Sequence, residues 1–392
     1  MEEVVIVSAV RTPIGKFGGS LKDISAKELG AFTVKEALKQ ANLKSEEVDS
    51  VIFGNVLQAG LGQNLARQIS VHAGIPHEVP AMTINEVCGS GMKSTILGAQ
   101  AIKLGEADIV VVGGSENMSQ TPHLVHDYRW DKSMEGKKLI DSMIHDGLTD
   151  AFEQTHMGVT AENVAEKYGI TREEQDQFAL ESQRKAQAAV EQNKFADEIV
   201  PIPIKNSNGD EHLFTTDEHI RHNLQLPDLQ KLKTPFIESG SVTAGNASGI
   251  NDCAASLVLM KKSLAEEKNI PYLATIKGYA EIGTDPALMG YAPYHATKKL
   301  IEKENIELDD IDLFEFNEAF AAQSVAVLRD LELDTSKVNV NGGAIALGHP
   351  IGASGTRILV TLLHEMKKRD AKLGLGSLCV GGGIGLSLLV ER

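Results

Sequence analysis

A cysteine set among glycines has the surroundings of a reactive thiol. Cys88 follows strand-forming residues, precedes Gly89-Ser90-Gly91, and stands where a helical pattern begins. Backbone N–H groups and the dipole at the start of a helix favour a thiolate, and glycines let a substrate approach the backbone. A free cysteine is more commonly a buried structural residue. Local context therefore leaves both interpretations of Cys88 open.

A histidine far along the chain favours the nucleophile. His349 lies in residues 342–350, a turn too rich in glycine to be ordinary core. Imidazole is the group suited to take a proton from a thiol near neutral pH. Cys379, just before three consecutive glycines, is either a second, acid–base thiol or a packed strand residue. Cys253 has no glycine turn around it and is interpreted as structural.

Several other chemistries find no support in the sequence. No GxxxxGK[ST], HExxH or GxSxG motif is present. Residues 89–94 come near a dinucleotide fingerprint, but Ser94 replaces the last glycine and the acidic residue expected after the next strand is missing. No Cys/His pair has metal-ligand spacing. We therefore expect neither a nicotinamide cofactor nor a metal.

Charge and composition narrow the possible partners. The formal net charge of -16 argues against nucleic acid, although a few local cations and backbone N–H groups can still hold a phosphate. The sequence shows no apolar run of membrane-spanning length and no leader pattern at its start. The three cysteines form no CxxC pair, which indicates reduced thiols. We expect a cytoplasmic protein that binds neither nucleic acid nor membrane.

The elements that must position these residues form an α/β pattern. Short β-branched runs alternate with helical patterns, and a capping box opens the first helix at Ser25. Residues 46–54 match residues 309–317, and predicted strands at 81–87 and 338–341 each lead through a turn to a helix and a strand ending in glycines. Any two strand–helix–strand units look alike, but the matching order favours two similar halves. Such halves would place the candidate thiol and imidazole at corresponding helix N-termini.

The middle of the chain, residues 120–248, is predicted to be an insertion that covers one face of the core. It is rich in charge, and Thr171-Arg172-Glu173-Glu174 has capping-box spacing for a helix at 175–192. Binding commonly occurs on such insertions. Tyr128-Arg129-Trp130 places aromatics beside a charge, which suits a subunit interface or, alternatively, a surface loop.

Three motifs in order carry a family resemblance. They are Asn85-Glu86-Val87-Cys88-Gly89-Ser90-Gly91, the run from Asn341 to Pro350, and Cys379-Val380-Gly381-Gly382-Gly383. With these motifs the chain resembles the thiolases over nearly its whole length, in particular the short-chain acetyl-CoA acetyltransferases. The resemblance implies an α/β fold of five layers (αβαβα) with two similar halves, 1–268 and 269–392. It also implies an inserted loop domain at about 120–248 that holds coenzyme A.

The resemblance also implies roles for individual residues. Cys88 is similar to the acylated nucleophile and His349 to its activating base. Cys379 is similar to the thiol that exchanges a proton with the α-carbon of the second acetyl-CoA. Asn317 matches the residue that positions a water in an oxyanion hole beside His349. Gly381 and Cys88 would supply the backbone N–H groups of a second oxyanion hole.

The positions that match the family's coenzyme A site lie mostly in the predicted insertion. They are Leu148, His156, Met157, Arg221, Phe236, Ala244, Ser248, Met289, Ala319 and Phe320. The sequence departs from the commoner pattern between His222 and Gln230. Lys231 and Lys233 could contact phosphates there or form a solvated charged face.

The activity implied by the resemblance is that of an acetyl-CoA C-acetyltransferase. It would condense two acetyl-CoA to acetoacetyl-CoA and CoA, or run the reverse thiolysis, in fatty-acid and ketone metabolism. No cofactor and no metal are expected beyond the coenzyme A thioester itself, and a homotetramer arranged as a dimer of dimers is implied. Two alternatives stay open: a 3-ketoacyl-CoA thiolase of broader chain length, and a condensing enzyme of the ketoacyl or hydroxymethylglutaryl-CoA synthase type.

Overall fold

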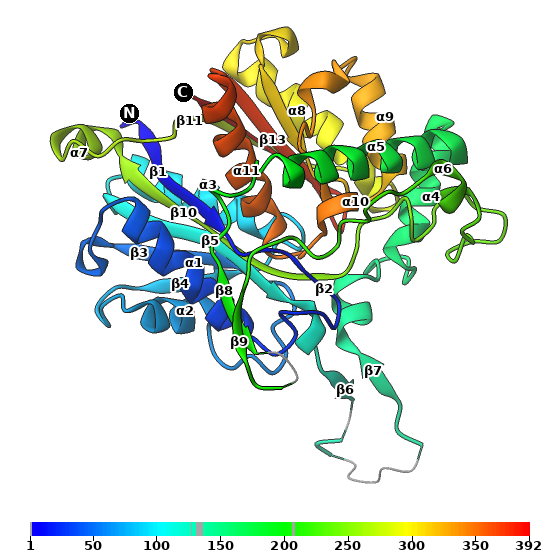
Figure 1. Cartoon of the computed structure of the whole chain (residues 1–392), viewed down its shortest axis with the longest axis horizontal. Helices are drawn as coiled ribbons and strands as arrows, with labels where there is room; N and C mark the ends of the chain where they lie inside the picture. The colour runs from blue at the N-terminus through cyan, green and yellow to red at the C-terminus, as the bar shows by residue number, and fades with distance from the viewer. Residues whose placement is uncertain (1, 127, 131–135, 206–207) are drawn as a thin grey trace.

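The computed structural model describes residues 2–126, 128–130, 136–205 and 208–392, and these residues build one large mixed sheet (Figure 1). Its strands run in the order β12-β13-β14-β11-β1-β10-β5-β3-β4, with β2 beside β10. Their bounds are β1 (Val4–Arg11), β2 (Gly15–Lys16), β3 (Ser50–Gly54), β4 (Ala81–Ile84), β5 (Ile109–Asn117), β10 (Asn251–Lys261), β11 (Ala274–Gly283), β12 (Leu313–Phe316), β13 (Leu373–Val380) and β14 (Ile384–Glu391).

The sheet consists of two halves that repeat one topology. In the first half, β1 pairs antiparallel with β10, β10 antiparallel with β5, and β5 parallel with β3. In the second half, β11, β14, β13 and β12 repeat the same pairings in the same order. The halves join where Val5 and Ile6 pair with Thr275 and Ala274. The two similar halves expected from the sequence are therefore confirmed.

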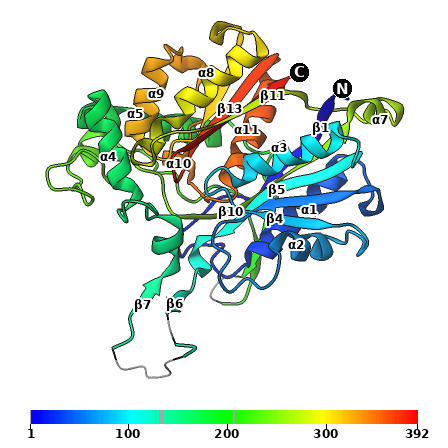
Figure 2. The same ribbon diagram turned by 180° about the vertical axis from the view of Figure 1, so that it is seen from behind.

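Helices cover both outer faces of the sheet and fill the space between its halves (Figures 1 and 2). Three apolar clusters fill the space between the layers. One packs the first half of the sheet against its outer helices, one surrounds the central helices, and one packs the second half against its own outer helices. The result is the predicted five-layer αβαβα arrangement. The outer helices are α1 (Ala26–Gln40) and α2 (Leu65–Ala73) on one side and α8 (Ala292–Glu304) and α9 (Ala321–Asp330) on the other, and the central helices are α3 (Ser90–Lys103) and α11 (Ser354–Arg369).

Alternating side chains on β5 show how the sequence specifies these layers. Val110 and Val112 face the central helices, whereas Ile109 and Val111 face α1 and α2. Successive side chains of a strand point to opposite faces, so a strand buried on both sides is apolar at every position. A slip of one residue would exchange the two faces, which is why the register is well specified.

Two predicted strands are shorter than expected. The strand predicted at 81–87 ends at Ile84, because the side-chain oxygen of Asn85 accepts a hydrogen bond from Val87 N and turns the chain. The stretch 338–341 makes a single bridge between Val338 and Phe314. There the side chain of Asn339 bonds both the N–H and the C=O of Phe316, replacing a strand backbone.

The remaining elements lie mostly in the middle of the chain. The predicted capping boxes at Ser25 and Thr171 are both present, although the second helix begins three residues before the predicted 175. The elements not yet listed are β6 (His123–Val125), β7 (Leu139–Asp141), α4 (Met157–Tyr168), α5 (Arg172–Glu191), β8 (Ile202–Lys205), β9 (Glu211–Phe214), α6 (Leu226–Gln230), α7 (Lys262–Glu267), α10 (Ala344–Leu347) and the short turns η1 (Ser45–Glu47), η2 (Met118–Gln120), η3 (Met143–Gly147), η4 (Pro286–Tyr291), η5 (Leu308–Asp310) and η6 (Thr335–Lys337).

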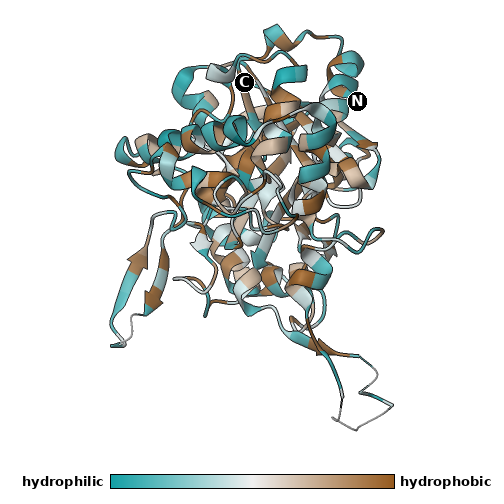
Figure 3. Cartoon of the chain, turned by 90° about the vertical axis from the view of Figure 1, so that its right-hand side faces the viewer, coloured by the Kyte–Doolittle hydropathy of each residue, from teal (hydrophilic) through white to brown (hydrophobic). Residues whose placement is uncertain are grey.

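Two hairpins project from the body, β6–β7 and β8–β9 (Figure 3). The β6–β7 segment includes the predicted interface residues 128–130, and the Trp130 side chain is 85% exposed. An exposed tryptophan suits a subunit contact, and the dimer of dimers stays a prediction. Within the described parts of the chain, no helix is long and apolar enough to span a membrane.

Candidate active site

The site lies where the N-termini of the two central helices cross. A Cβ added to Gly355 in α11 would lie 2.3 Å from Met92 N, and one added to Gly91 in α3 would lie 2.7 Å from Thr356 N. Both contacts are to backbone atoms, so only glycine permits this approach. Thr356 Oγ1 also donates to the carbonyl of Gly91 at 2.9 Å. The crossing brings together the two loops that precede these helices.

Those loops place the predicted nucleophile and base in contact. His349 Nε2 lies 3.3 Å from Cys88 Sγ, and His349 Nδ1 lies 2.6 Å from Ser354 Oγ. Ser354 Oγ donates its own proton to the carbonyl of Pro350, so it accepts from Nδ1–H. This network selects the tautomer in which Nε2 carries a lone pair. His349 is therefore oriented to accept the thiol proton of Cys88.

Burial sets the protonation of both groups. It lowers the pKa of His349 to about 3, with the nearby Arg357 guanidinium acting in the same direction. Burial also raises the pKa of Cys88 to about 11, although the N–H groups of Gly381 and of Cys88 itself oppose this rise. The helix N-terminus was expected to favour a thiolate, but desolvation outweighs it. Cys88 rests as a thiol, half-buried and facing a cavity, beside a neutral base.

The backbone before Cys88 is strained. Val87 has φ of 44°, a value that β-branched residues rarely adopt. Side-chain hydrogen bonds hold the turn: Val87 N donates to Asn85, and Ser90 Oγ donates to Val87 O at 2.7 Å. Strain of this kind concentrates at functional sites. Here it directs the Cys88 side chain toward His349.

A buried carboxylate ties the loops together from behind. Glu116, at the end of β5, accepts hydrogen bonds from the backbone N–H groups of Val56, Leu57 and Gly352. Gly352 belongs to the turn between His349 and α11, so this carboxylate fastens that turn to the first half of the chain. Burial raises the pKa of Glu116 to about 7.

Asn317 and Cys379 lie behind the cavity wall, where they do not border the cavity. The amide nitrogen of Asn317 is 3.5 Å from both ring nitrogens of His349, too long for a strong hydrogen bond. Its Oδ1 is buried without a partner among the described residues. Cys379 is fully buried, and its Sγ donates to Gln323 Oε1 at 3.0 Å. Burial and the neighbouring Cys88 raise the pKa of Cys379.

The cavity in front of Cys88 has a volume of about 600 Å³ and opens to the surface. Gly381 and all ten residues predicted to contact coenzyme A border it, as do Cys88 and His349. His156 stacks on Phe236 with ring centroids 4.7 Å apart, and burial lowers the pKa of His156. The walls are therefore largely apolar with a few convergent polar groups, which is typical of a ligand site.

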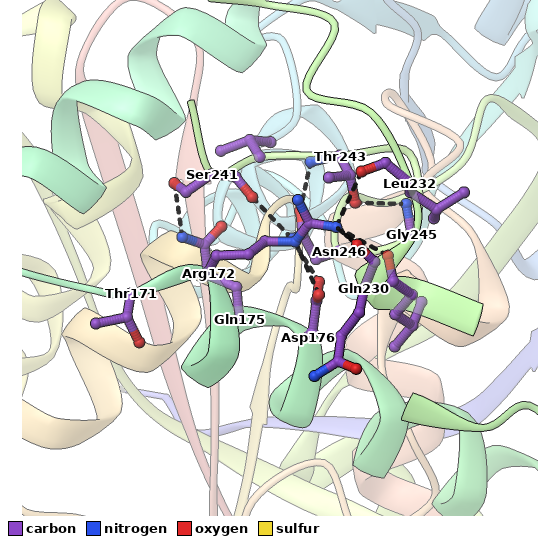
Figure 4. Close-up of polar contacts among 12 residues, drawn as sticks. Thr171, Arg172, Gln175, Asp176, Gln230, Leu232, Ser241, Thr243, Gly245 and Asn246 are labelled. Atoms are coloured by element: carbon purple, nitrogen blue, oxygen red, sulfur yellow. Dashed lines mark hydrogen bonds and ion pairs between the residues drawn. The ribbon is translucent and has the colours of Figure 1, made fainter. Parts of the chain in front are cut away.

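Arg172 holds one wall of the cavity in place through hydrogen bonds that are drawn in Figure 4. Its Nη2 donates to the carbonyls of Leu229 and Leu232, and its Nε bonds Asp176 at 2.8 Å. The other oxygen of the buried Asp176 carboxylate accepts a hydrogen bond from the side-chain amide of Asn246. The Oδ1 atom of Asn246 in turn accepts a hydrogen bond from the backbone N–H of Thr243. This chain of bonds orients the stretch that carries Ala244 and Ser248.

The sequence did not predict every residue of the cavity. Lys16, Phe17, Glu218 and His219 also border it, and burial together with Arg221 and Lys16 lowers the pKa of His219 to about 4. The one available signal was the glycine-rich run at residues 15–19.

The two lysines directly after α6, which were predicted as possible phosphate contacts, do not line the cavity. Lys231 pairs with Asp228 at the surface, 2.8 Å away, and neither Lys231 nor Lys233 borders the cavity. Cys253 is fully buried in β10, in agreement with a structural residue. In the described ranges no cluster of His, Cys, Asp and Glu could hold a metal ion.

Comparison with known proteins shows one family along the whole chain. The thiolase N-terminal domain model matches residues 4–263, and the thiolase C-terminal domain model matches residues 270–392. An acetyl-CoA acetyltransferase of Cupriavidus necator is 57% identical over 392 residues, covering 100% of both proteins.

Solved structures agree. The Bacillus anthracis acetyl-CoA acetyltransferase superimposes with a TM-score of 0.97 at 46% identity, covering 100% of this chain and 99% of that one. Human mitochondrial 3-ketoacyl-CoA thiolase in complex with CoA gives a TM-score of 0.96 at 45% identity, covering 100% and 98%.

Proposed function

The chain belongs to the thiolase family, and we propose that it is an acetyl-CoA acetyltransferase. It condenses two acetyl-CoA to acetoacetyl-CoA and CoA, or cleaves acetoacetyl-CoA in reverse. Curated relatives at 57% and 55% identity over nearly their full length carry the name acetyl-CoA acetyltransferase. The observation that carries the proposal is the Cys88 thiol, 3.3 Å from His349 Nε2, at the wall of an apolar cavity.

In the first half-reaction Cys88 becomes acetylated. His349 takes the thiol proton, the sulfur attacks the thioester carbonyl of acetyl-CoA, and the departing CoA thiolate takes the proton from His349. Backbone N–H groups of Cys88 and Gly381, which counteract the rise in the pKa of Cys88, stabilise the oxyanion that forms on the way. Donors placed in this manner contribute on the order of several kcal/mol.

In the second half-reaction a carbon–carbon bond forms. Cys379 gives its proton to His349 and, as a thiolate, takes a methyl proton from a second acetyl-CoA. The resulting carbanion attacks the acetyl carbonyl, the bond to Cys88 breaks, and His349 returns a proton to Cys88. Asn317, with its unpartnered Oδ1 beside His349, holds a water at the oxyanion. Decarboxylating condensing enzymes use a second histidine or an asparagine in place of Cys379, which disfavours that alternative.

The acyl group that the site accepts is short. Met157, Met289 and Phe320 border the cavity with bulky apolar side chains, and each methylene that is not accommodated costs about 1 kcal/mol or more. The second candidate, a 3-ketoacyl-CoA thiolase of broader range, is favoured by the likeness to the human mitochondrial enzyme of that name. Equal kcat/KM for acetoacetyl-CoA and 3-ketodecanoyl-CoA would select the second candidate.

The proposal extends to cofactors, cellular compartment and subunit assembly. Every bond change above is handled by side chains and thioester substrates, so the enzyme uses no metal and no cofactor. Dependence on free thiols, as found for all three cysteines, suits the reducing cytoplasm. The projecting β6–β7 hairpin with exposed Trp130 supports assembly of a dimer of dimers, which sedimentation would test.

Mass spectrometry tests the proposal directly. Incubation with acetyl-CoA and an acid quench should leave one acetyl group on Cys88, with ping-pong kinetics in steady state. Cys88→Ser should lose both label and activity, whereas the control Cys253→Ser should keep them. Wild-type enzyme without acetyl on Cys88, or with acetyl only elsewhere, would overturn the assignment.

A further inference from the structure

A buried glutamine connects the two predicted catalytic groups behind the cavity wall. Gln323 lies in the first turn of α9 and is 1% exposed. Its Oε1 accepts a hydrogen bond from Cys379 Sγ at 3.0 Å, and its Nε2 donates to the backbone carbonyl of Asn317 at 3.4 Å. One amide therefore bridges the thiol and the residue that lies against His349.

The surroundings of Cys379 make this contact important. The sulfur sits in an apolar cluster that includes Met157, Met289 and Phe320, where a polar group without a partner is costly. Packing also fixes the glutamine, because a Cβ on Gly290 would lie 2.8 Å from Gln323 Cβ. Gln323 has little freedom to move away from the thiol.

The contact to Asn317 sets the orientation of the amide. If the amide were reversed, Oε1 would face the carbonyl oxygen of Asn317 and lose a hydrogen bond. In the observed orientation the amide accepts from the Cys379 thiol, and after rotation about its last bond the NH₂ group could donate to the thiolate. A methionine of similar size can do neither, and a carboxylate can only accept.

We propose that Gln323 is a positioning residue for proton transfer by Cys379: it aligns the thiol and ties it to the backbone of Asn317. This inference rests on the proposed function. Both side-chain hydrogen bonds of Gln323 go to Cys379 and Asn317, so it acts through Cys379 and not on the substrate. It should affect carbon–carbon bond formation and leave acetyl transfer to Cys88 nearly intact.

A pH dependence measured on a Gln323 variant can be interpreted only if the titratable groups near this residue are known. Cys379 on β13 is the titratable side chain bonded to it, with Cys88 beyond Cys379 and His349 beyond Asn317. Gly290 of η4 packs on Gln323, and Val164 of α4 lies 3.6 Å from a Cβ built on Gly290; neither residue titrates.

Two variants of the full-length enzyme test the proposal against a structural role. Gln323→Met keeps the volume and removes both hydrogen bonds. Gln323→Glu, when protonated, offers a carbonyl acceptor and an O–H donor in place of the amide, but loses the donor when ionised. Gln100→Met is the matched control, because it removes a partly buried glutamine contact to Tyr279 far from the site.

The readouts are exchange of acetyl between CoA and Cys88, and condensation followed separately. Gln323→Met should exchange acetyl within about threefold of wild type but condense roughly 30-fold more slowly. For Gln323→Glu, the condensation rate relative to wild type should rise about tenfold from about pH 8 to about pH 6, because burial raises the pKa of a carboxyl, as it raises the pKa of the buried Glu116 to about 7. Gln100→Met should match wild type in both assays.

Equal losses of exchange and condensation in Gln323→Met, or a Gln323→Glu ratio that does not change with pH, would overturn the inference. Near-normal condensation by Gln323→Met would overturn it as well. Failure of the proposed function looks different, because wild type itself would then show no acetyl-Cys88 and no exchange.

Discussion

Replacing Gly355 by alanine tests whether the crossing of α3 and α11 sets the distance between thiol and imidazole. The new methyl carbon would lie 2.3 Å from Met92 N and 3.1 Å from Met92 Cα. Both atoms are backbone inside a helix, so no side-chain rotation can relieve the overlap. The two helices must move apart.

The size of the movement follows from contact distances. A methyl group needs roughly 3.4 Å from its neighbours, about 1 Å more than Gly355 allows. Because His349 and Cys88 precede opposite helices, a shift of this size lengthens their 3.3 Å contact beyond hydrogen-bond reach. Misplacement by about 1 Å can cost about 10²-fold in rate, and overpacking costs about 1–3 kcal/mol of stability.

Pre-steady-state acetylation is the appropriate assay. Rapid mixing with acetyl-CoA, acid quench and mass spectrometry give the rate constant for acetyl-Cys88 formation, and thermal unfolding gives the loss of stability. Gly283→Ala is the control, because a Cβ at Gly283 meets nothing within 4 Å. It should match wild type in both measurements.

A folded Gly355→Ala enzyme that acetylates Cys88 at the wild-type rate would refute this reasoning. So would an equal loss of rate in the Gly283→Ala control, because the effect would then not arise at the helix crossing.

Cys379→Ser should still acquire and exchange acetyl on Cys88, while condensation and thiolysis fall roughly 10²–10⁴-fold; near-normal condensation, or loss of exchange as complete as in Cys88→Ser, would contradict the division of labour. Because burial lowers the pKa of His349 to about 3, its ring stays neutral above about pH 5, so the rate of Cys88 acetylation should show no acid limb near the ordinary histidine pKa of about 6.5. Such a limb in pre-steady-state acetylation would show that His349 is more solvated than its surroundings indicate. Arg172→Leu strips the buried Asp176 carboxylate of its cation and should raise KM for acetyl-CoA about tenfold with kcat nearly unchanged; the surface variant Arg329→Leu should change neither.

Much of the fold and the identity of the reactive pair could be predicted from the sequence, because the signals are local. Capping boxes at Ser25 and Thr171 join residues three apart, and the apolar runs of β5 and β13 reflect strands buried on both faces. The repeated order of elements predicted the paired halves. Glycine-rich turns marked Cys88 and His349 as candidates, and the family motifs indicated the cavity residues.

Only the tertiary structure decided how these groups interact. Cys88 and His349 lie 261 residues apart, and their contact depends on two helices crossing at Gly91 and Gly355. Burial reverses the expected thiolate at Cys88, because desolvation is a property of the packed interior that neighbours in the sequence do not report. For the same reason the sequence showed no sign of Gln323, a helix residue that acquires its contact with Cys379 only when α9 packs against β13.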